Sequence, residues 1–172
     1  MSTRTGEGAV AFTDIVGFTE FTADRGDAGA LVVLDAQDRI VRAALPTGAR
    51  IVKELGDGLM LWFPEAAAGL AACLDLREEF EAATTDDLPL WVRMGMHWGC
   101  PTARGEDLVG HDVNIAARIV DVAGPGELLV SEHLCTAIDD EVPGLELEEL
   151  GPVVMKGIPD PVGLFRATKR AR

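Results

Sequence analysis

Two aspartates, Asp14 and Asp57, occupy positions from which their carboxylates could hold divalent cations. Asp14 stands at the end of a short apolar run, Ala9 to Ile15, which predicts a buried strand. Asp57 lies between two glycines and two apolar runs, a pattern typical of a tight β-hairpin. Two carboxylates at one sheet edge can clamp the metal ions of a phosphoryl-transfer site. Each aspartate alone also fits a simpler role, Asp57 as a turn residue and Asp14 as a helix cap.

The segment Ile15-Val16-Gly17-Phe18-Thr19 connects the first strand to a predicted helix. Backbone amides of Gly17, Phe18 and Thr19 at a helix N-terminus could hold phosphate oxygens. A plain connecting turn fits this stretch equally well.

Asn114 and Arg118 are four residues apart in a segment with helical spacing, so they share a helix face. Asn114 interrupts an apolar face between Val113 and Ile115. The amide and the guanidinium together suit a hydroxyl and a phosphate. A solvated face with one capping amide is the alternative.

Other sequence features exclude several chemistries. The chain has no GxxxxGK[ST], GxGxxG or GxSxG motif and no CxxC pair among its three cysteines. His111 and His133 lack the spacing of a metal site, and His97 is more typical of a hydrogen-bonded core or edge histidine than of a ligand. Lys156 would ordinarily be an exposed loop lysine.

The elements that must position these residues follow from hydrophobic periodicity and turn signals. Helices are predicted over Thr19 to Ala23, Ala28 to Leu45, Pro64 to Ala83, Val109 to Val122 and Glu132 to Ile138. Strands are predicted over Ala9 to Ile15, Arg50 to Leu55, Leu59 to Phe63, Leu90 to Trp98, Glu127 to Val130, Leu145 to Leu150 and Val162 to Ala167.

This order predicts an α+β fold with a ferredoxin-like split βαβ core (βαββαβ) and a C-terminal extension of a helix and strands. In that topology the first strand pairs with one strand of the hairpin, so Asp14 and Asp57 converge. We expect residues 1–172 to form one domain. Because little sequence precedes the first strand, we expect no regulatory domain in this chain.

Composition restricts the partners. The chain has 29 acidic and 15 basic residues and a net charge of −14, which disfavours nucleic-acid binding. The stretch Met1 to Gly8 has no apolar signal core, and no apolar run is long enough to span a bilayer. With few, scattered cysteines, these features predict a cytoplasmic protein without a membrane partner.

Several segments together resemble the catalytic domain of the class III adenylyl and guanylyl cyclases, over about Ala9 to Arg166. Phe12 to Thr19 and Lys53 to Gly58 match the two metal motifs of the family, and Asp107 to Arg118 matches its transition-state segment. Arg93 to His97 resembles its central strand. Met155-Lys156-Gly157 followed by Leu164-Phe165-Arg166 resembles its C-terminal phosphate-binding region.

The resemblance implies roles for these residues. Asp14 and Asp57, with the carbonyl of Ile15, would bind two Mg²⁺ or Mn²⁺ ions. Asn114 would orient the ribose of the substrate, and Arg118 would meet charge developing on the α-phosphate. Arg93 and Lys156 would hold the remaining phosphates, and the products would be a cyclic nucleotide and pyrophosphate.

Lys53 and Asp107 match the purine-selecting positions of the family. Adenine offers an acceptor at N1 and a donor amine at C6, so lysine and aspartate both pair with it. Guanine inverts that edge, which leaves both contacts repulsive or unpaired. The resemblance therefore implies that the substrate is ATP.

In this family the site forms between two chains, which implies a homodimer with two complete sites. One chain would supply Asp14, Asp57 and Arg93, and the other would supply Lys53, Asp107, Asn114, Arg118 and Lys156. Two departures stand out. The Gly99 to Asp107 span is shorter than the corresponding arm of mammalian-type domains, and His111-Asp112 replaces residues that are often Asn and Thr, with no clear chemical consequence.

Three alternatives remain open at this point. A guanylyl cyclase on the same fold is disfavoured by Lys53 and Asp107. A catalytically silent nucleotide-binding module would be indicated by loss of a metal aspartate, Asn114 or Arg118, and none is lost. A polymerase-palm relative that makes cyclic dinucleotides would carry a Gly-Gly-acidic-acidic hairpin, whereas this turn is Gly56-Asp57-Gly58.

Overall fold

The computed structural model describes residues 3–4 and 6–171. Its helices are α1 (Phe18–Ala44), α2 (Ala66–Ala83), α3 (His111–Val122) and α4 (Glu132–Ala137). Its strands are β1 (Thr3–Arg4), β2 (Gly8–Ile15), β3 (Arg50–Leu55), β4 (Gly58–Phe63), β5 (Val92–Gly99), β6 (Thr102–Arg104), β7 (Asp107–Val109), β8 (Leu128–Ser131), β9 (Leu145–Val153) and β10 (Val162–Lys169).

Seven of these strands form one sheet in the order β3-β4-β2-β5-β8-β10-β9. The first four, with α1 and α2 between them in sequence, form the βαββαβ core, in which β2 pairs antiparallel with both β4 and β5. The parallel strand β8 and the β9–β10 hairpin extend the sheet. The predicted α+β fold with a ferredoxin-like core is confirmed, and so is the pairing of the first strand with the hairpin.

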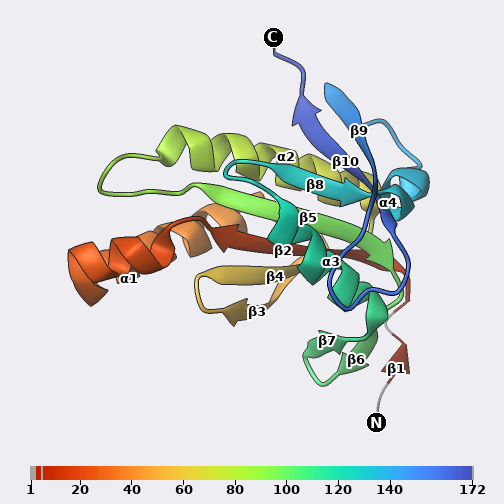
Figure 1. Cartoon of the computed structure of the whole chain (residues 1–172), viewed down its shortest axis with the longest axis horizontal. Coiled ribbons are helices and arrows are strands. Elements are labelled where there is room, and N and C mark those ends of the chain that lie inside the picture. Colours follow the sequence, from red (N-terminus) through yellow and green to blue (C-terminus); the bar gives the residue numbers. More distant parts are fainter. Residues whose placement is uncertain (1–2, 5, 172) are drawn as a thin grey trace.

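Helices cover both faces of the sheet, with α1 and α2 on one side and α3 on the other (Figure 1). The side chains of β2 alternate between the two layers, as the pleat of a strand requires. Ala9 and Ala11 pack with the α2 side, while Val10 and Phe12 pack with the α3 side. Burial of β2 on both faces explains why residues 9–12 are apolar without alternation.

The structure corrects the predicted boundaries at the N-terminal half. The two helices expected over Thr19 to Ala23 and Ala28 to Leu45 are joined in α1, with a kink at Gly26, where φ is 77° and ψ is 177°. Left-handed φ is easy only for glycine, so the chain bends there without strain from a side chain.

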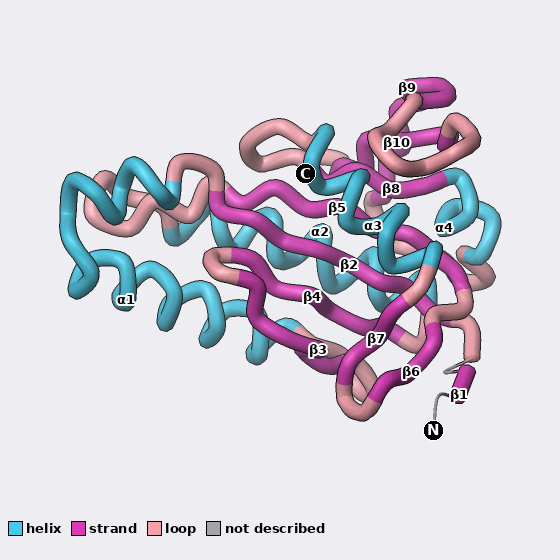
Figure 2. The backbone as a smooth tube through the Cα atoms, turned by 60° about the horizontal axis from the view of Figure 1, so that its bottom comes forward, coloured by secondary structure: helices cyan, strands magenta, loops and turns pink. Residues whose placement is uncertain are grey.

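A small second sheet was not predicted. It has the order β1-β6-β7, and it contains the shortened span between Gly99 and Asp107 (Figure 2). The strand predicted over Ala9 to Ile15 is present but is not the first, because β1 precedes it and pairs with β6. Strands of two or three residues carry too little periodicity to be recognised.

No helix in the described ranges is long and apolar enough to cross a membrane. Of the polar N-terminal stretch Met1 to Gly8, the residues Met1, Ser2 and Thr5 lie outside the described part, as does Arg172 at the other end.

Candidate active site

Asp14 and Asp57 converge at one end of the β2 and β4 strands. β2 and β4 pair with Thr13 opposite Leu59, which brings the Gly56–Asp57 turn beside the end of β2. The Asp57 carboxylate accepts a hydrogen bond from the backbone N–H of Ile15, with 3.2 Å between N and Oδ2. Gly58 permits this approach, because a Cβ there would lie 2.5 Å from the Thr13 carbonyl oxygen.

The two carboxylates repel one another. Burial and then the charge of Asp14 raise the pKa of Asp57 above its usual range. Arg93 partly compensates, because it stands directly opposite Asp14 in the β2–β5 pairing. Its Nη2 lies 2.8 Å from the Asp14 carboxylate, and its Nη1 donates to the backbone carbonyl of Asp121 at 3.2 Å. The resulting cluster joins β2, β5 and the end of α3.

The strand-to-helix turn after β2 and this cluster together line an open pocket of about 360 Å³. Gly17 precedes α1 with φ of 77° and no side-chain cap, so the first backbone N–H groups of the helix are free of side-chain partners. The pocket is lined by Asp14, Ile15, Val16, Gly17, Phe18, Thr19, Glu20, Asp57, Arg93, Ala123 and Pro125. Carboxylates, a guanidinium and a helix N-terminus therefore meet in one cavity.

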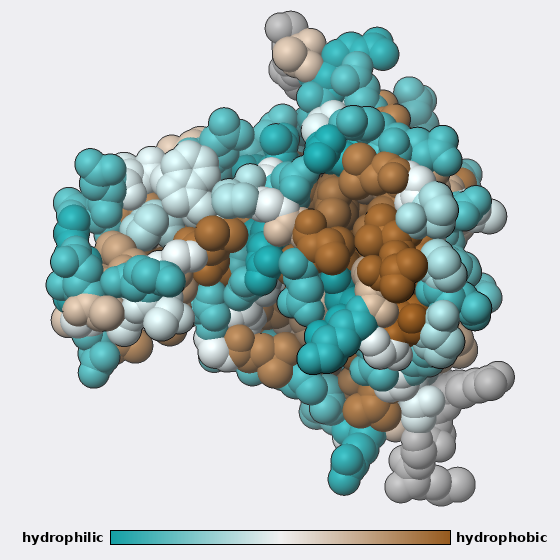
Figure 3. All heavy atoms as spheres, in the orientation of Figure 1, coloured by the Kyte–Doolittle hydropathy of each residue, from teal (hydrophilic) through white to brown (hydrophobic). Residues whose placement is uncertain are grey.

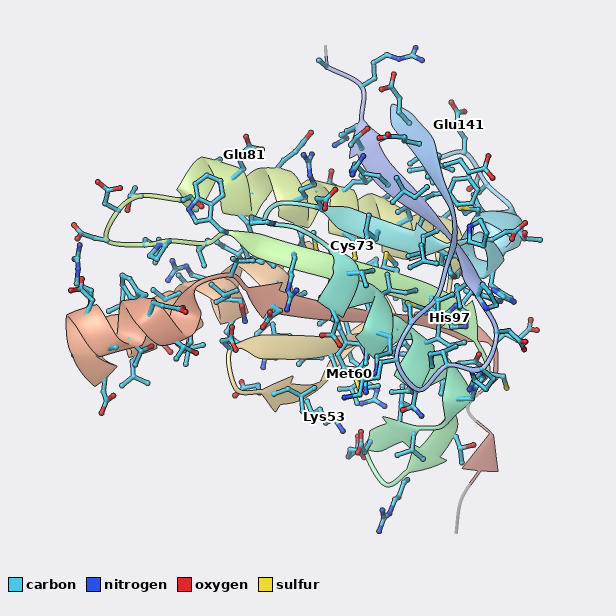
Figure 4. All side chains as sticks on the ribbon, in the orientation of Figure 1. Lys53, Met60, Cys73, Glu81, His97 and Glu141 are labelled. Carbon is cyan, nitrogen blue, oxygen red and sulfur yellow. The ribbon has the colours of Figure 1, made fainter. Side chains whose placement is uncertain are left out.

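Lys53 and Asp107 form a second, separate pair. Lys53 extends from β3 toward the β6–β7 hairpin (Figure 4), and its Nζ lies 2.9 Å from the Asp107 carboxylate. The hydrogen bond from Lys53 lowers the pKa of Asp107. Both side chains are more than one-third exposed, so the pair is accessible to a ligand. Neither residue lines the pocket around Asp14.

Asn114 and Arg118 share a face of α3, as predicted from their spacing. That face is the accessible one: Asn114 is exposed, whereas Val113 and Ile115 are buried. The expectation that Asn114 interrupts an apolar face was therefore wrong. Successive residues of an α-helix are rotated by about 100° around its axis, so Asn114 points in a different direction from Val113 and Ile115. Arg118 forms an ion pair with Asp121 one turn further on, at 3.1 Å.

A buried histidine anchors the N-terminus of α3, the helix that carries this face. His97 is 1% exposed, its Nδ1 lies 2.8 Å from the Ser131 hydroxyl, and its Nε2 lies 3.0 Å from the Asp112 carboxylate. The second Asp112 oxygen accepts from the backbone N–H of Cys100. The interpretation of His97 as a hydrogen-bonded core residue is confirmed. Asp112, to which the sequence assigned no consequence, holds α3 against β5.

This anchor makes stability depend on pH. Burial lowers the pKa of His97 below 6.5, against the opposing hydrogen bond and charge of Asp112, while His111 and His133 add repulsion. The unfolded chain then binds the proton more readily, so the free energy of unfolding falls as pH drops below about 6.5. The free energy of unfolding, measured by chemical denaturation, should fall more steeply with decreasing pH in the native protein than in His97→Gln. The two slopes should differ by up to about 1.4 kcal/mol per pH unit. Equal slopes would contradict a buried neutral imidazole.

Lys156 lies in the loop between β9 and β10 and is exposed, as expected of a loop lysine. It does not reach the pocket around Asp14 within one chain. The site residues thus fall into two groups: one set shares a single pocket, and the other set lies on separate accessible surfaces of the same chain.

Two residues beside the site were not singled out from the sequence. Gln37 of α1 donates to the carbonyl oxygen of Asp57, and Asp121 contacts both Arg93 and Arg118. Gln37 could have been found from the sequence. Its spacing from Val33 and Val41, at i, i+4 and i+8, places a polar residue on an apolar helix face.

Comparison with known proteins gives consistent matches over nearly the whole chain. The model of the adenylate and guanylate cyclase catalytic domain matches residues 1–166. The chain is 32% identical to a pH-sensitive adenylate cyclase of Mycobacterium tuberculosis over 94% of its length and 41% of that protein. It is 35% identical to an adenylate cyclase of Streptomyces griseus over 70% of its length and 30% of that protein.

The fold has a close counterpart among solved structures. The adenylyl cyclase CyaB of P. aeruginosa superposes with a TM-score of 0.85, at 24% identity, over 100% of this chain and 98% of that one. The chain spans less than half the length of the two sequence relatives above. Because the family model covers all but the last six residues, this chain belongs to the adenylate and guanylate cyclase catalytic domain family.

Proposed function

We propose that this chain is an adenylyl cyclase domain that converts ATP to 3′,5′-cyclic AMP and pyrophosphate. The observation that carries the proposal is the pocket in which Asp14, Asp57, Arg93 and the glycine turn meet. Its contents match the needs of a triphosphate: carboxylates for cations, and a guanidinium and backbone N–H groups for phosphate oxygens. Relatives named adenylate cyclase, at 32% and 35% identity, support the same activity.

The donor set fits divalent metal ions with hard oxygen ligands. No group of three or more Asp, Glu, His or Cys side chains in the described ranges is arranged to hold a metal. Two repelling carboxylates are nevertheless the usual protein share of a Mg²⁺ site that substrate phosphates and water complete. We infer that Asp14, Asp57 and the Ile15 carbonyl would hold two Mg²⁺ or Mn²⁺ ions. Bound there, the ions would lower the pKa of the ribose 3′-hydroxyl and offset phosphate charge.

The chain's own groups then position an in-line displacement. The ribose 3′-hydroxyl gives up its proton to solvent, and its oxygen forms a bond to the α-phosphorus. The bond from that phosphorus to the oxygen bridging the α- and β-phosphates breaks, and pyrophosphate leaves. Amides of residues 17–19 and Arg93 would hold phosphate oxygens on one side of the site. Asn114 would orient the ribose, Arg118 would stabilise charge on the α-phosphate, and Lys156 would bind the terminal phosphates.

The separation of the site residues favours a site shared between two copies of the chain. None of the residues expected on the other side of the substrate lines the Asp14 pocket, so in the proposed mechanism a second copy of the chain would bring them to it: Lys53, Asp107, Asn114, Arg118 and Lys156. An apolar surface supports this arrangement: brown side chains gather beside α3 and the β9–β10 loop in Figure 3, and Val154 in that loop is 80% exposed. Contiguous exposed apolar surface is typical of protein interfaces. We therefore propose a symmetric homodimer with two sites.

Incubation of the domain with ATP or GTP and Mn²⁺ or Mg²⁺, followed by product identification, tests the activity and its base preference together. The native protein should make cyclic AMP from ATP with a higher kcat/KM than cyclic GMP from GTP, and chelation of the metal should stop both. The Lys53→Glu, Asp107→Cys double variant should shift the ATP-to-GTP ratio of kcat/KM toward GTP. The reason is that an acceptor replaces the donor, and a weak donor replaces the acceptor.

The change in the ATP-to-GTP ratio of kcat/KM shows whether Lys53 and Asp107 recognise the base. A mismatch of hydrogen-bonding edges can cost a factor of up to about 10⁴ in kcat/KM, so a shift of ten-fold or more is easily measured even if total activity falls. The Arg50→Ala variant is a suitable control. Arg50 contacts the β6–β7 hairpin, which carries Asp107, by donating to the Glu106 carbonyl, but it has no proposed contact with the base. A ratio that stays unchanged in the double variant would mean that the purine is read elsewhere.

A further inference from the structure

Gln37 is a polar residue on the buried face of α1. It is 2% exposed, and Val33 and Val41, one turn to either side, are fully buried. Its Nε2 donates to the backbone carbonyl oxygen of Asp57 at 3.2 Å. In the described part of the chain its Oε1 is buried and lacks a hydrogen-bond partner. Exchanging the two amide atoms is no remedy, because the oxygen would then face the Asp57 carbonyl.

A buried acceptor without a partner lowers the stability of the fold. An apolar side chain of similar length at this position would avoid that cost. Features that lower stability in this way are often found beside functional sites, where a residue is retained for activity and not for stability. The contact made by Gln37 is to the backbone of a residue proposed to bind metal.

The turn that carries Asp57 needs such a contact, because it ends a hairpin at the edge of the sheet. β3 is the last strand on that side and pairs only with β4 among the described strands. On the β2 side the turn is held by the Ile15 N–H bond to the Asp57 carboxylate and by the Leu59 N–H bond to the Thr13 hydroxyl. Gln37 holds it from the helical layer, through the backbone of Asp57 itself.

We propose that Gln37 is a positioning residue for Asp57, which keeps the Asp57 carboxylate close to that of Asp14 for joint binding of divalent cations. Like charges drive the two carboxylates apart, and a hairpin tip at a sheet edge can yield to that repulsion. The hydrogen bond from α1 opposes the movement by fixing the backbone from which the Asp57 side chain projects. This inference rests on the proposed function, because it needs the two aspartates to act as metal ligands.

Gln37→Met tests the proposal, since methionine has a similar length and no donor. The dissociation constant for Mn²⁺ alone, measured from the EPR signal of free Mn²⁺, should rise roughly ten-fold or more, as for other residues that orient metal ligands. The half-saturating Mn²⁺ concentration for cyclisation should rise by a similar factor. Turnover at saturating Mn²⁺ should stay near the native value. The thermal midpoint should change little, because loss of the bond to the Asp57 carbonyl opposes the gain from removing the unpartnered oxygen.

Thr84→Val is the matched control. It removes a side-chain bond to a backbone carbonyl, from Thr84 to Phe80 at the end of α2, which is not among the pocket residues. It should leave the Mn²⁺ dissociation constant unchanged. Gln37→Leu provides a second apolar variant should methionine disturb the packing. Native Mn²⁺ affinity in a folded Gln37 variant would overturn the positioning role, whereas cyclisation that persists after chelation of all divalent metal would overturn the proposed metal site itself.

Discussion

Replacing Asp14 or Asp57 with alanine should remove nearly all cyclase activity, by roughly 10³-fold or more. Each substitution deletes one of the two carboxylates proposed to hold the cations, and the loss of several kcal/mol of transition-state stabilisation corresponds to that factor. The fold should survive. Burial and then the charge of Asp14 raise the pKa of Asp57, so its removal relieves an unfavourable ionised group in the folded state even though the Ile15 N–H loses an acceptor.

Steady-state kinetics over a range of Mn²⁺ concentrations, with thermal unfolding alongside, would check this expectation. Glu54→Ala is the control, because Glu54 is an exposed carboxylate on the same hairpin, outside the pocket. It should keep near-native activity. If Asp14→Ala or Asp57→Ala kept most of its activity at saturating metal, the two carboxylates could not be the metal ligands.

Much of the fold was predictable because its signals are local. The apolar run of β2, the Gly56-Asp57-Gly58 turn and the helical spacing of α3 each specify an element, and their order specifies a split βαβ core. The convergence of Asp14 and Asp57 followed from that order, because a hairpin strand paired with the first strand places both at one end. The family resemblance added the remaining site residues.

What escaped prediction depends on contacts between distant segments. The β1-β6-β7 sheet consists of strands too short for periodicity, and β1 pairs with a strand about a hundred residues later. The role of Asp112 in α3 depends on His97 in β5, and that of Gln37 depends on a carbonyl in the hairpin turn. The spacing of Gln37 marks it as a polar residue on an apolar helix face, but a hydrogen bond to a remote segment leaves no local pattern that identifies its partner. A single sequence therefore does not reveal these contacts.

Within one chain, some of the proposed site residues line the Asp14 pocket and the others lie outside it, as expected if two copies of the chain share each site. Lys53 and Asp57 are four residues apart on one hairpin, yet Asp57 lines the pocket and Lys53 faces Asp107 on β7. Opposite sides of the hairpin would thus serve two different sites across a two-fold axis. Arg118, on the accessible face of α3, would enter the partner's pocket, and its loss should lower turnover by roughly 10³-fold, as for an arginine finger.

Mixing Asp57→Ala chains with Arg118→Ala chains tests this claim most directly. Each variant alone should be nearly inactive, because both of its sites carry the same lesion. In a mixed dimer one site carries both lesions and the other carries neither. With random pairing, half of the dimers are mixed and each has one intact site, so about a quarter of native activity should return at equal concentrations. Absence of recovery, when chain exchange has been demonstrated, would contradict the account and place each complete site within a single chain.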